Sequence, residues 1–155
     1  MKSLRPTSLP AAALLLSLLA TQGALAADAP TVAAARQARF KQLGADFKAV
    51  NEAVRVSNWT PASMAAYARR VAAAAHDLPA WFPRGSGPDT AAKTKAKASI
   101  WSDEAGFRVA ASALTTQADK LQFLINSNDA AAIPTQVQAV GRACASCHAN
   151  FRQKD

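Results

Sequence analysis

The residues with the most specific chemistry in this sequence are two cysteines and a histidine. Cys144, Cys147 and His148 form the pattern C-x-x-C-H, and the chain of 155 residues contains no other cysteine. This pattern is typical of covalent haem attachment. Two thiols at this spacing can bond to the two vinyl groups of a haem, and on a helix the histidine shares their face and can give a ring nitrogen to the iron. We therefore predict one haem c, attached through Cys144 and Cys147, with His148 as an axial iron ligand.

Three other kinds of site use cysteines at a similar spacing. A disulfide between Cys144 and Cys147 is disfavoured, because residues three apart on a helix rarely meet disulfide geometry. A thioredoxin-like pair needs its first cysteine at the start of a helix that follows a strand, and we expect no strand before the motif. A zinc site needs four ligands, and outside the motif only His76 and scattered carboxylates are available. Haem attachment is favoured over all three.

The second axial position of the iron decides the kind of haem protein. From residue 27 onward the chain has one methionine, Met64, and one other histidine, His76. Met64 lies on the apolar face of an expected helix, where core packing is its ordinary role. His76 lies near an expected helix C-terminus, where we expect it at the surface. The sequence therefore predicts a five-coordinate iron, and the alternative is a six-coordinate, low-spin electron carrier with Met64 as ligand. A peroxidase would need a distal acid–base residue, which we cannot place, so we expect no enzymatic activity.

Apolar residues recur at steps of three and four in four segments, which is the pattern of amphipathic helices. Thr60 and Pro61 predict a helix start, and the Pro- and Gly-rich stretch 77–90 predicts a long connection. The sequence thus predicts an all-α fold, an antiparallel four-helix bundle with one covalently attached haem. The four segments are residues 40–54, 64–78, 100–125 and 133–151.

The first 26 residues have the pattern of a signal peptide. Lys2 and Arg5 precede a short apolar run at 11–20, and Ala24-Leu25-Ala26 offers a small-x-small cleavage site. We predict export to the periplasm, removal of 1–26 and one domain over 27–155, with no membrane insertion after processing. The alternative, an uncleaved anchor, is disfavoured because the run is too short to span a bilayer comfortably. Two of the 18 basic residues and none of the 10 acidic ones lie in the leader, so a formal charge of +6 remains from +8.

Three segments resemble the cytochrome c′ family, whose members are four-helix bundles with C-x-x-C-H near the C-terminus. Residues 35–44 (ARQARFKQLG) are similar to the first helix of that family, and residues 96–101 (AKASIW) resemble the start of its third. Residues 142–152 (RACASCHANFR) match its haem-binding segment, with an aromatic residue and an arginine after the histidine. The resemblance covers essentially all of the chain after the leader.

The resemblance implies roles for three further residues. Phe40 occupies the position that covers the vacant face of the haem, where relatives with methionine are low-spin electron carriers. Arg36, one turn earlier, pairs with a haem propionate by the same resemblance, and a solvated charge is its alternative role. Arg152 borders the proximal side of the haem and influences whether a ligand can replace His148.

We expect small gaseous molecules as ligands. Phe40 offers no hydrogen-bond donor, and bound dioxygen gains from a donor, whereas nitric oxide and carbon monoxide depend on one less. The protein is therefore expected to capture nitric oxide or carbon monoxide and to exchange electrons, its positive charge assisting an acidic redox partner protein. The resemblance implies a homodimer through the first two helices. Lys93, Lys95 and Lys97 lack interleaved aromatic residues, so we expect no nucleic-acid binding.

Overall fold

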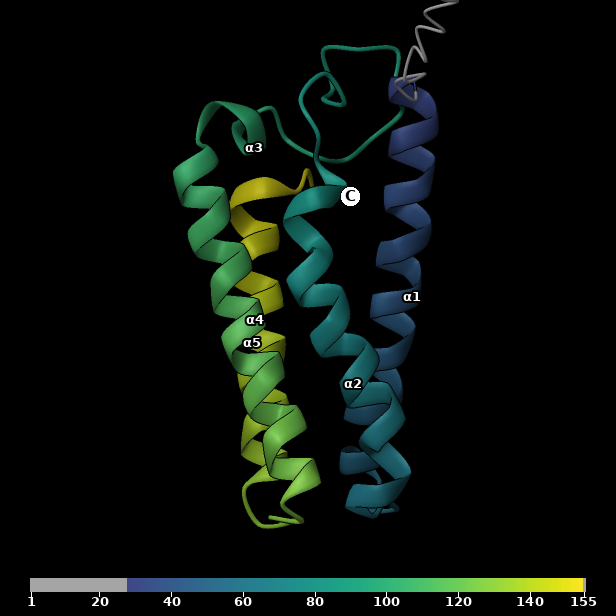
Figure 1. Cartoon of the computed structure of the whole chain (residues 1–155), viewed down its shortest axis with the longest axis vertical. Coiled ribbons are helices and arrows are strands. Elements are labelled where there is room, and N and C mark those ends of the chain that lie inside the picture. Colours follow the sequence, from purple (N-terminus) through teal and green to yellow (C-terminus); the bar gives the residue numbers. More distant parts are fainter. Residues whose placement is uncertain (1–27, 155) are drawn as a thin grey trace, which may run out of the picture.

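Four long helices form an antiparallel bundle in the computed structural model, which describes residues 28–154 (Figure 1). The predicted leader, 1–26, and Asp155 lie outside the described residues. A short 3₁₀ helix and a one-turn helix lie in the connection from α2 to α4. The predicted all-α bundle is confirmed. The elements are α1 (Ala29–Arg55), α2 (Pro61–Asp77), η1 (Leu78–Trp81), α3 (Ser99–Ser102), α4 (Glu104–Asn126) and α5 (Ile133–Phe151).

The start of α2 is fixed by local hydrogen bonds, as its sequence predicts. The Thr60 hydroxyl accepts from the backbone N–H of Ser63 at 3.2 Å, and the Ser63 hydroxyl accepts from the N–H of Thr60 at 3.0 Å. Pro61 occupies the first turn, where its missing N–H leaves no hydrogen bond unmade. This reciprocal capping satisfies two N–H groups that the helix itself leaves unpaired.

The predicted third helix, 100–125, is wrong at its beginning, because the helix is interrupted at Asp103, between α3 and α4. Asp103 leaves helical geometry, with φ −120° and ψ 62°, and its carboxylate accepts from the N–H of Gly106 at 2.9 Å. Aspartate favours this capping role over a helix interior. Ile100 and Phe107 are both buried in one core on either side of the break, so the apolar period continues across it.

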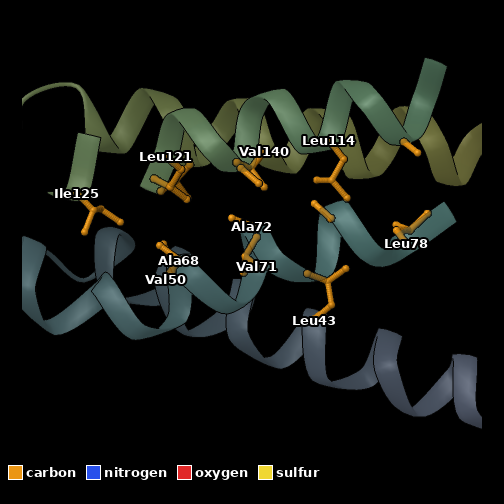
Figure 2. Close-up of a cluster of buried hydrophobic side chains, with 14 of the residues drawn as sticks. Leu43, Val50, Ala68, Val71, Ala72, Leu78, Leu114, Leu121, Ile125 and Val140 are labelled. Atoms are coloured by element: carbon orange, nitrogen blue, oxygen red, sulfur yellow. The ribbon is translucent and has the colours of Figure 1, made fainter. Parts of the chain in front are cut away.

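Small and aliphatic side chains fill the bundle between α1, α2, α4 and α5 (Figure 2). Val50, Ala68, Leu121 and Val140 are each 0% exposed. The alanines of α2 let α4 approach closely, since they add little bulk between the two backbones. No helix within 28–154 is long and apolar enough to cross a membrane.

The two ends of the bundle differ in their connections. The α1–α2 and α4–α5 turns lie at one end, and the long connection 82–98 and the last turns of α5 lie at the other (Figure 1). α1 and α2 meet near their turn and diverge toward the end that holds the long connection (Figure 1). We call this second end the motif end, because α5 carries Cys144, Cys147 and His148 there.

Candidate haem site

The C-x-x-C-H motif lies on the last two turns of α5. Cys144 and Cys147 are half-buried and pack against the hydrophobic core, and neither forms a disulfide. Burial raises the pKa of both thiols above its ordinary value, and for Cys147 the neighbouring Cys144 adds to the rise. His148 follows on the same helical face and is exposed. The face therefore presents two neutral thiols and an imidazole side by side, as attachment to one haem requires.

The other chemistries considered for the motif do not fit this arrangement. Cys144 lies in the second half of a 19-residue helix, whereas a thioredoxin-like pair needs a helix start. Within residues 28–154 no group of three or more His, Cys, Asp or Glu side chains is placed to hold a metal ion. His76, the one further histidine offered for zinc, has its Nε2 3.0 Å from the carboxylate of Asp119 on α4.

Met64 lies in the core and His76 lies at the surface, as the sequence predicts. Met64 is 1% exposed in the core at the start of α2, next to the α1–α2 turn and so at the opposite end of the bundle from the motif. His76 has a side chain that is 58% exposed. The predictions of core packing for Met64 and surface placement for His76 are confirmed.

An aromatic cluster crosses the motif end from α1 to α5. The Phe40 ring packs edge-on against Trp81, with 5.1 Å between centroids, and against Phe82 at 6.0 Å. Phe82 contacts Phe107 at 4.9 Å, and Phe107 contacts Phe151 at 5.5 Å. These contacts connect Phe40 to the turn of α5 that follows His148, so a flat apolar group held by α5 meets aromatic side chains across this end.

Arg36 is a buried cation at the same end. It is 2% exposed, and its guanidinium lies 4.7 Å from the centroid of the Phe82 ring. It donates to the carbonyl oxygen of Trp81 at 3.3 Å, to the carbonyl and hydroxyl oxygens of Ser86 at 3.2 and 3.1 Å, and to the hydroxyl of Thr94 at 3.1 Å. The alternative of a solvated charge is therefore wrong.

Within residues 28–154 the hydrogen-bond partners of Arg36 are all uncharged. A charge removed from water is costly unless an opposite charge compensates it, and burial accordingly lowers the pKa of this guanidinium. An anion delivered by a ligand would supply that compensation. Arg36 lies one turn before Phe40 in α1. A haem, which carries carboxylate groups on one edge, thus fits both the aromatic cluster and the buried cation.

The helix that holds the motif ends one residue before Arg152. Arg152 has extended geometry, φ −116° and ψ 137°, and pairs with Ala96 in an isolated β-bridge, and its N–H donates to the carbonyl of His148 at 3.1 Å. It nevertheless stays beside the histidine. Desolvation by the surrounding protein lowers the pKa of His148 even though the residue is exposed, and the charge of Arg152 lowers it further, which favours the neutral imidazole that can bind iron.

Sequence reasoning missed Trp81, Phe82, Ser86 and Thr94 as parts of this site. All four lie in or next to the connection after α2, which we interpreted only as a long loop. A tryptophan and a phenylalanine in succession within a Pro- and Gly-rich stretch were the available signal, since large aromatic side chains in a connection need a surface on which to pack.

A bundle of four antiparallel helices with this motif near the end of the last one defines a class of protein, the helix-bundle c-type cytochromes. Comparison with known proteins narrows the class. The family model described as Cytochrome C' matches residues 31–152. Cytochrome c′ of Rhodospirillum rubrum is 33% identical over 140 residues, which cover 90% of this chain and 94% of that protein. This chain belongs to the cytochrome c′ family, whose members carry covalently bound haem c.

Solved structures have the same fold. The crystal structure of cytochrome c′ from Rubrivivax gelatinosus is similar with a TM-score of 0.75 and 27% identity, covering 81% of this chain and 98% of that one. A nitric oxide complex of a variant of cytochrome c prime from Alcaligenes xylosoxidans is similar with a TM-score of 0.75 and 22% identity, covering 83% of this chain and 98% of that one. The second likeness concerns the fold alone.

Proposed function

We propose that the protein binds nitric oxide, and also carbon monoxide, at a five-coordinate haem iron, and that it does so in the periplasm after removal of residues 1–26. The observation that carries this proposal is the position of Phe40. It lies at the motif end among Trp81 and Phe82. Its ring has no atom that can bind iron, and the side chains of Met64 and His76 lie elsewhere.

Each residue of the site has one task in this proposal. Cys144 and Cys147 hold the haem by thioethers, and His148 gives a ring nitrogen to the iron. Arg36 gives a charged hydrogen bond to a propionate. Arg152 lies beside His148 and governs access to the proximal face. When bound, the haem supplies the iron that takes up a diatomic ligand and changes its oxidation state.

Phe40 selects among diatomic ligands by excluding water and offering no donor. Dioxygen acquires partial negative charge when bound and gains from a hydrogen-bond donor, whereas nitric oxide and carbon monoxide depend on one less. The nitric oxide complex of the Alcaligenes xylosoxidans relative supports this ligand class. We further propose that the protein is not an enzyme, since the proposed residues around the iron include no acid–base pair for turnover.

A homodimer through α1 and α2 is part of the proposal. Of the eight alanines of α2, Ala68, Ala72 and Ala75 are buried inside the bundle, Ala62, Ala66 and Ala73 are exposed, and Ala65 and Ala74 are half-buried. The buried group serves the contact within one chain, and the exposed group leaves a small-residue surface on which a second copy can approach. Sedimentation of the haem-loaded protein tests this state.

Absorption spectra of the oxidised and reduced holoprotein, recorded before and after nitric oxide, test the main proposal. We expect a high-spin ferric spectrum and a rapid change of the ferrous spectrum on mixing with nitric oxide. Phe40→Met should convert the spectrum to low spin and slow ligand binding, because a thioether then reaches the iron. Phe123→Met, at a phenylalanine of α4 that is 66% exposed, is the matched control and should change neither. A low-spin ferric spectrum of the unaltered protein contradicts the proposal and favours the electron-carrier alternative.

A further inference from the structure

Two parts of the chain without acidic residues meet at the motif end. Residues 90–102 and residues 130–154 contain no Asp or Glu. The bridge between Ala96 and Arg152 places them side by side. Together they bring five cationic residues to one region of the surface, which we call the basic face. These residues are Lys93, Lys95, Lys97, Arg152 and Lys154.

The basic face is fixed against the helix that carries the iron ligand. The N–H of Lys97 donates to the carbonyl of Phe151 at 3.0 Å, and the N–H of Gln153 donates to the carbonyl of Lys95 at 2.8 Å. The ammonium of Lys97 donates to the carbonyl of Ala149 at 2.9 Å, which is the residue after His148. Lys97 is therefore held beside the turn of His148, and Arg152 and Lys154 line the same surface depression as His148. Lys95 is bonded to the residue after Arg152, and Lys93 follows two residues away along the same segment.

Little negative charge is available to neutralise this face. At the start of α4, Glu104 forms ion pairs with Arg84 and, at 3.7 Å, with Arg108, while Asp103 caps its own helix. Among the described residues no carboxylate lies within ion-pair distance of Lys93 or Lys154, both of which are exposed.

His148 lies in a shallow depression of about 280 Å³ on this surface, which the end of α5 and the following residues line. An electron that enters or leaves a haem attached here passes close to the basic face. We infer that the basic face is the docking surface for a protein with an acidic face that carries one electron. This inference rests on the proposed function, because it requires a haem attached at α5. The electron moves between the partner and the haem iron, with no bond formed or broken.

The surface chemistry favours a protein over a membrane or a nucleic acid. Insertion into a lipid surface needs exposed apolar side chains beside the charges. The large apolar side chains exposed in the described part of the chain are Val56, Tyr67, Val109 and Phe123, and none lies in 90–102 or 130–154. The basic face also lacks the exposed aromatic rings on which bases stack. The basic face therefore favours a protein partner with an acidic surface, because complementary charge accelerates the encounter of two proteins.

Two double variants with the same change in net charge test the inference. Lys93→Glu/Lys154→Glu reverses charge on the basic face. Lys48→Glu/Lys120→Glu reverses exposed lysines on the outer sides of α1 and α4, farther from the motif end. The ferrous holoproteins are oxidised by anionic hexacyanoferrate(III) and by cationic tris(phenanthroline)cobalt(III) in stopped flow, at about 10 mM ionic strength and at higher salt.

We expect the basic-face variant to react about tenfold more slowly with the anionic oxidant at low salt, and faster with the cationic one, with the difference lost at high salt. The control variant should stay within about twofold of the unaltered protein. Equal slowing of both variants overturns the inference, because net charge alone then explains the rates. A second readout is independent of haem reactivity: amide NMR shifts on adding poly-L-glutamate should fall on 93–97 and 152–154. Shifts spread over α1 or α4 overturn the inference.

Vesicles of phosphatidylglycerol and phosphatidylcholine test whether the basic face binds a membrane instead of a protein. Tight binding of the unaltered protein to the vesicles, lost in the basic-face variant while oxidation rates stay unchanged, assigns the face to a membrane and overturns the inference. Nitric oxide spectra of the same samples separate this test from that of the proposed function. Normal nitric oxide spectra with charge-insensitive kinetics refute the docking surface alone. Absent nitric oxide spectra of a haem-loaded protein refute the proposed gas binding and leave the docking surface standing, because that surface requires only the attached haem.

Discussion

The two ends of the bundle differ in the kinds of side chain that fill them. Near the α1–α2 and α4–α5 turns, the core consists of aliphatic side chains such as Val50, Leu121 and Ile125, which are 3% exposed or less (Figure 2). At the motif end the corresponding layer consists of aromatic rings, half-buried cysteines and the buried Arg36. The first end is filled by the chain's own aliphatic side chains, and the second gathers the residues that we propose to hold haem.

Two buried charges make the same contrast on a single helix. On α1, Asp46 is 3% exposed and receives hydrogen bonds from the guanidinium of Arg70 at 2.6 to 3.1 Å, so its charge is compensated within the chain. Arg36, three turns earlier, has neutral oxygen atoms as its hydrogen-bond partners in the described part of the chain. A paired buried charge indicates structure, and a buried charge without its opposite indicates a place for a ligand.

The largest effect belongs to the motif. Cys144→Ala/Cys147→Ala should abolish covalent haem attachment, because both thioether bonds lose their sulfur. Mass spectrometry of the denatured protein, which retains only covalently bound groups, measures the loss. Each single variant should keep one bond and part of the haem mass signal. Haem that survives denaturation in the double variant contradicts the assignment.

A cavity in the aliphatic end should cost stability and leave ligand binding unchanged. Leu121→Ala removes a fully buried side chain and should lower the free energy of unfolding by about 2–5 kcal/mol. Urea unfolding followed by circular dichroism measures this cost. Leu121→Met, which nearly conserves volume, is the control and should cost less than about 1.5 kcal/mol. If Leu121→Ala alters the nitric oxide spectrum, the two ends are not independent.

The buried pair on α1 and α2 should make stability depend on acid pH. Hydrogen bonds from Arg70 lower the pKa of Asp46 below its ordinary value. A lowered native pKa gives stability that is complete above the unfolded value, about 3.9, and is lost as pH falls through the native pKa. Asp46→Asn should therefore cost about 1–3 kcal/mol at neutral pH and less in acid, measured by urea unfolding against pH. Asp77→Asn, at an exposed carboxylate that makes no side-chain cap, is the control and should cost less than about 0.5 kcal/mol at neutral pH.

The smallest effect concerns the cap of α2. Thr60→Ala removes the side-chain acceptor for the N–H of Ser63 and should cost about 1 kcal/mol in thermal or urea unfolding. Thr60→Ser keeps the hydroxyl and should retain most of the stability. A cost equal to that of Leu121→Ala contradicts the local role of this hydrogen bond.

The sequence was most informative where the structure depends on residues that are close together along the chain. Thr60 and Pro61 predicted the start of α2, and the spacing of Cys144, Cys147 and His148 predicted one shared helical face. The break at Asp103 was missed because the apolar period of the core continues through it, so periodicity outweighed the capping signal. The extended geometry at Arg152 was missed because the bridge that causes it comes from Ala96, far away in the sequence.

The surroundings of Arg36 could not be predicted for a related reason. Its oxygen partners lie 45 to 58 residues away along the chain, in a connection whose path no local pattern specifies. The sequence alone placed Arg36 on the same helical face as Phe40, and its burial followed only from the tertiary structure.

The β-bridge between Ala96 and Arg152 has a practical consequence for labelling the protein. An affinity tag or fluorescent reporter joined directly after residue 155 starts three residues from Gln153, whose N–H donates to the carbonyl of Lys95, so we expect it to disturb this bridge beside the iron ligand. The turn at Asn128, which already has a positive φ of 59°, lies at the opposite end of the molecule. A reporter inserted there leaves the colour of the protein, and thus its optical assay, intact.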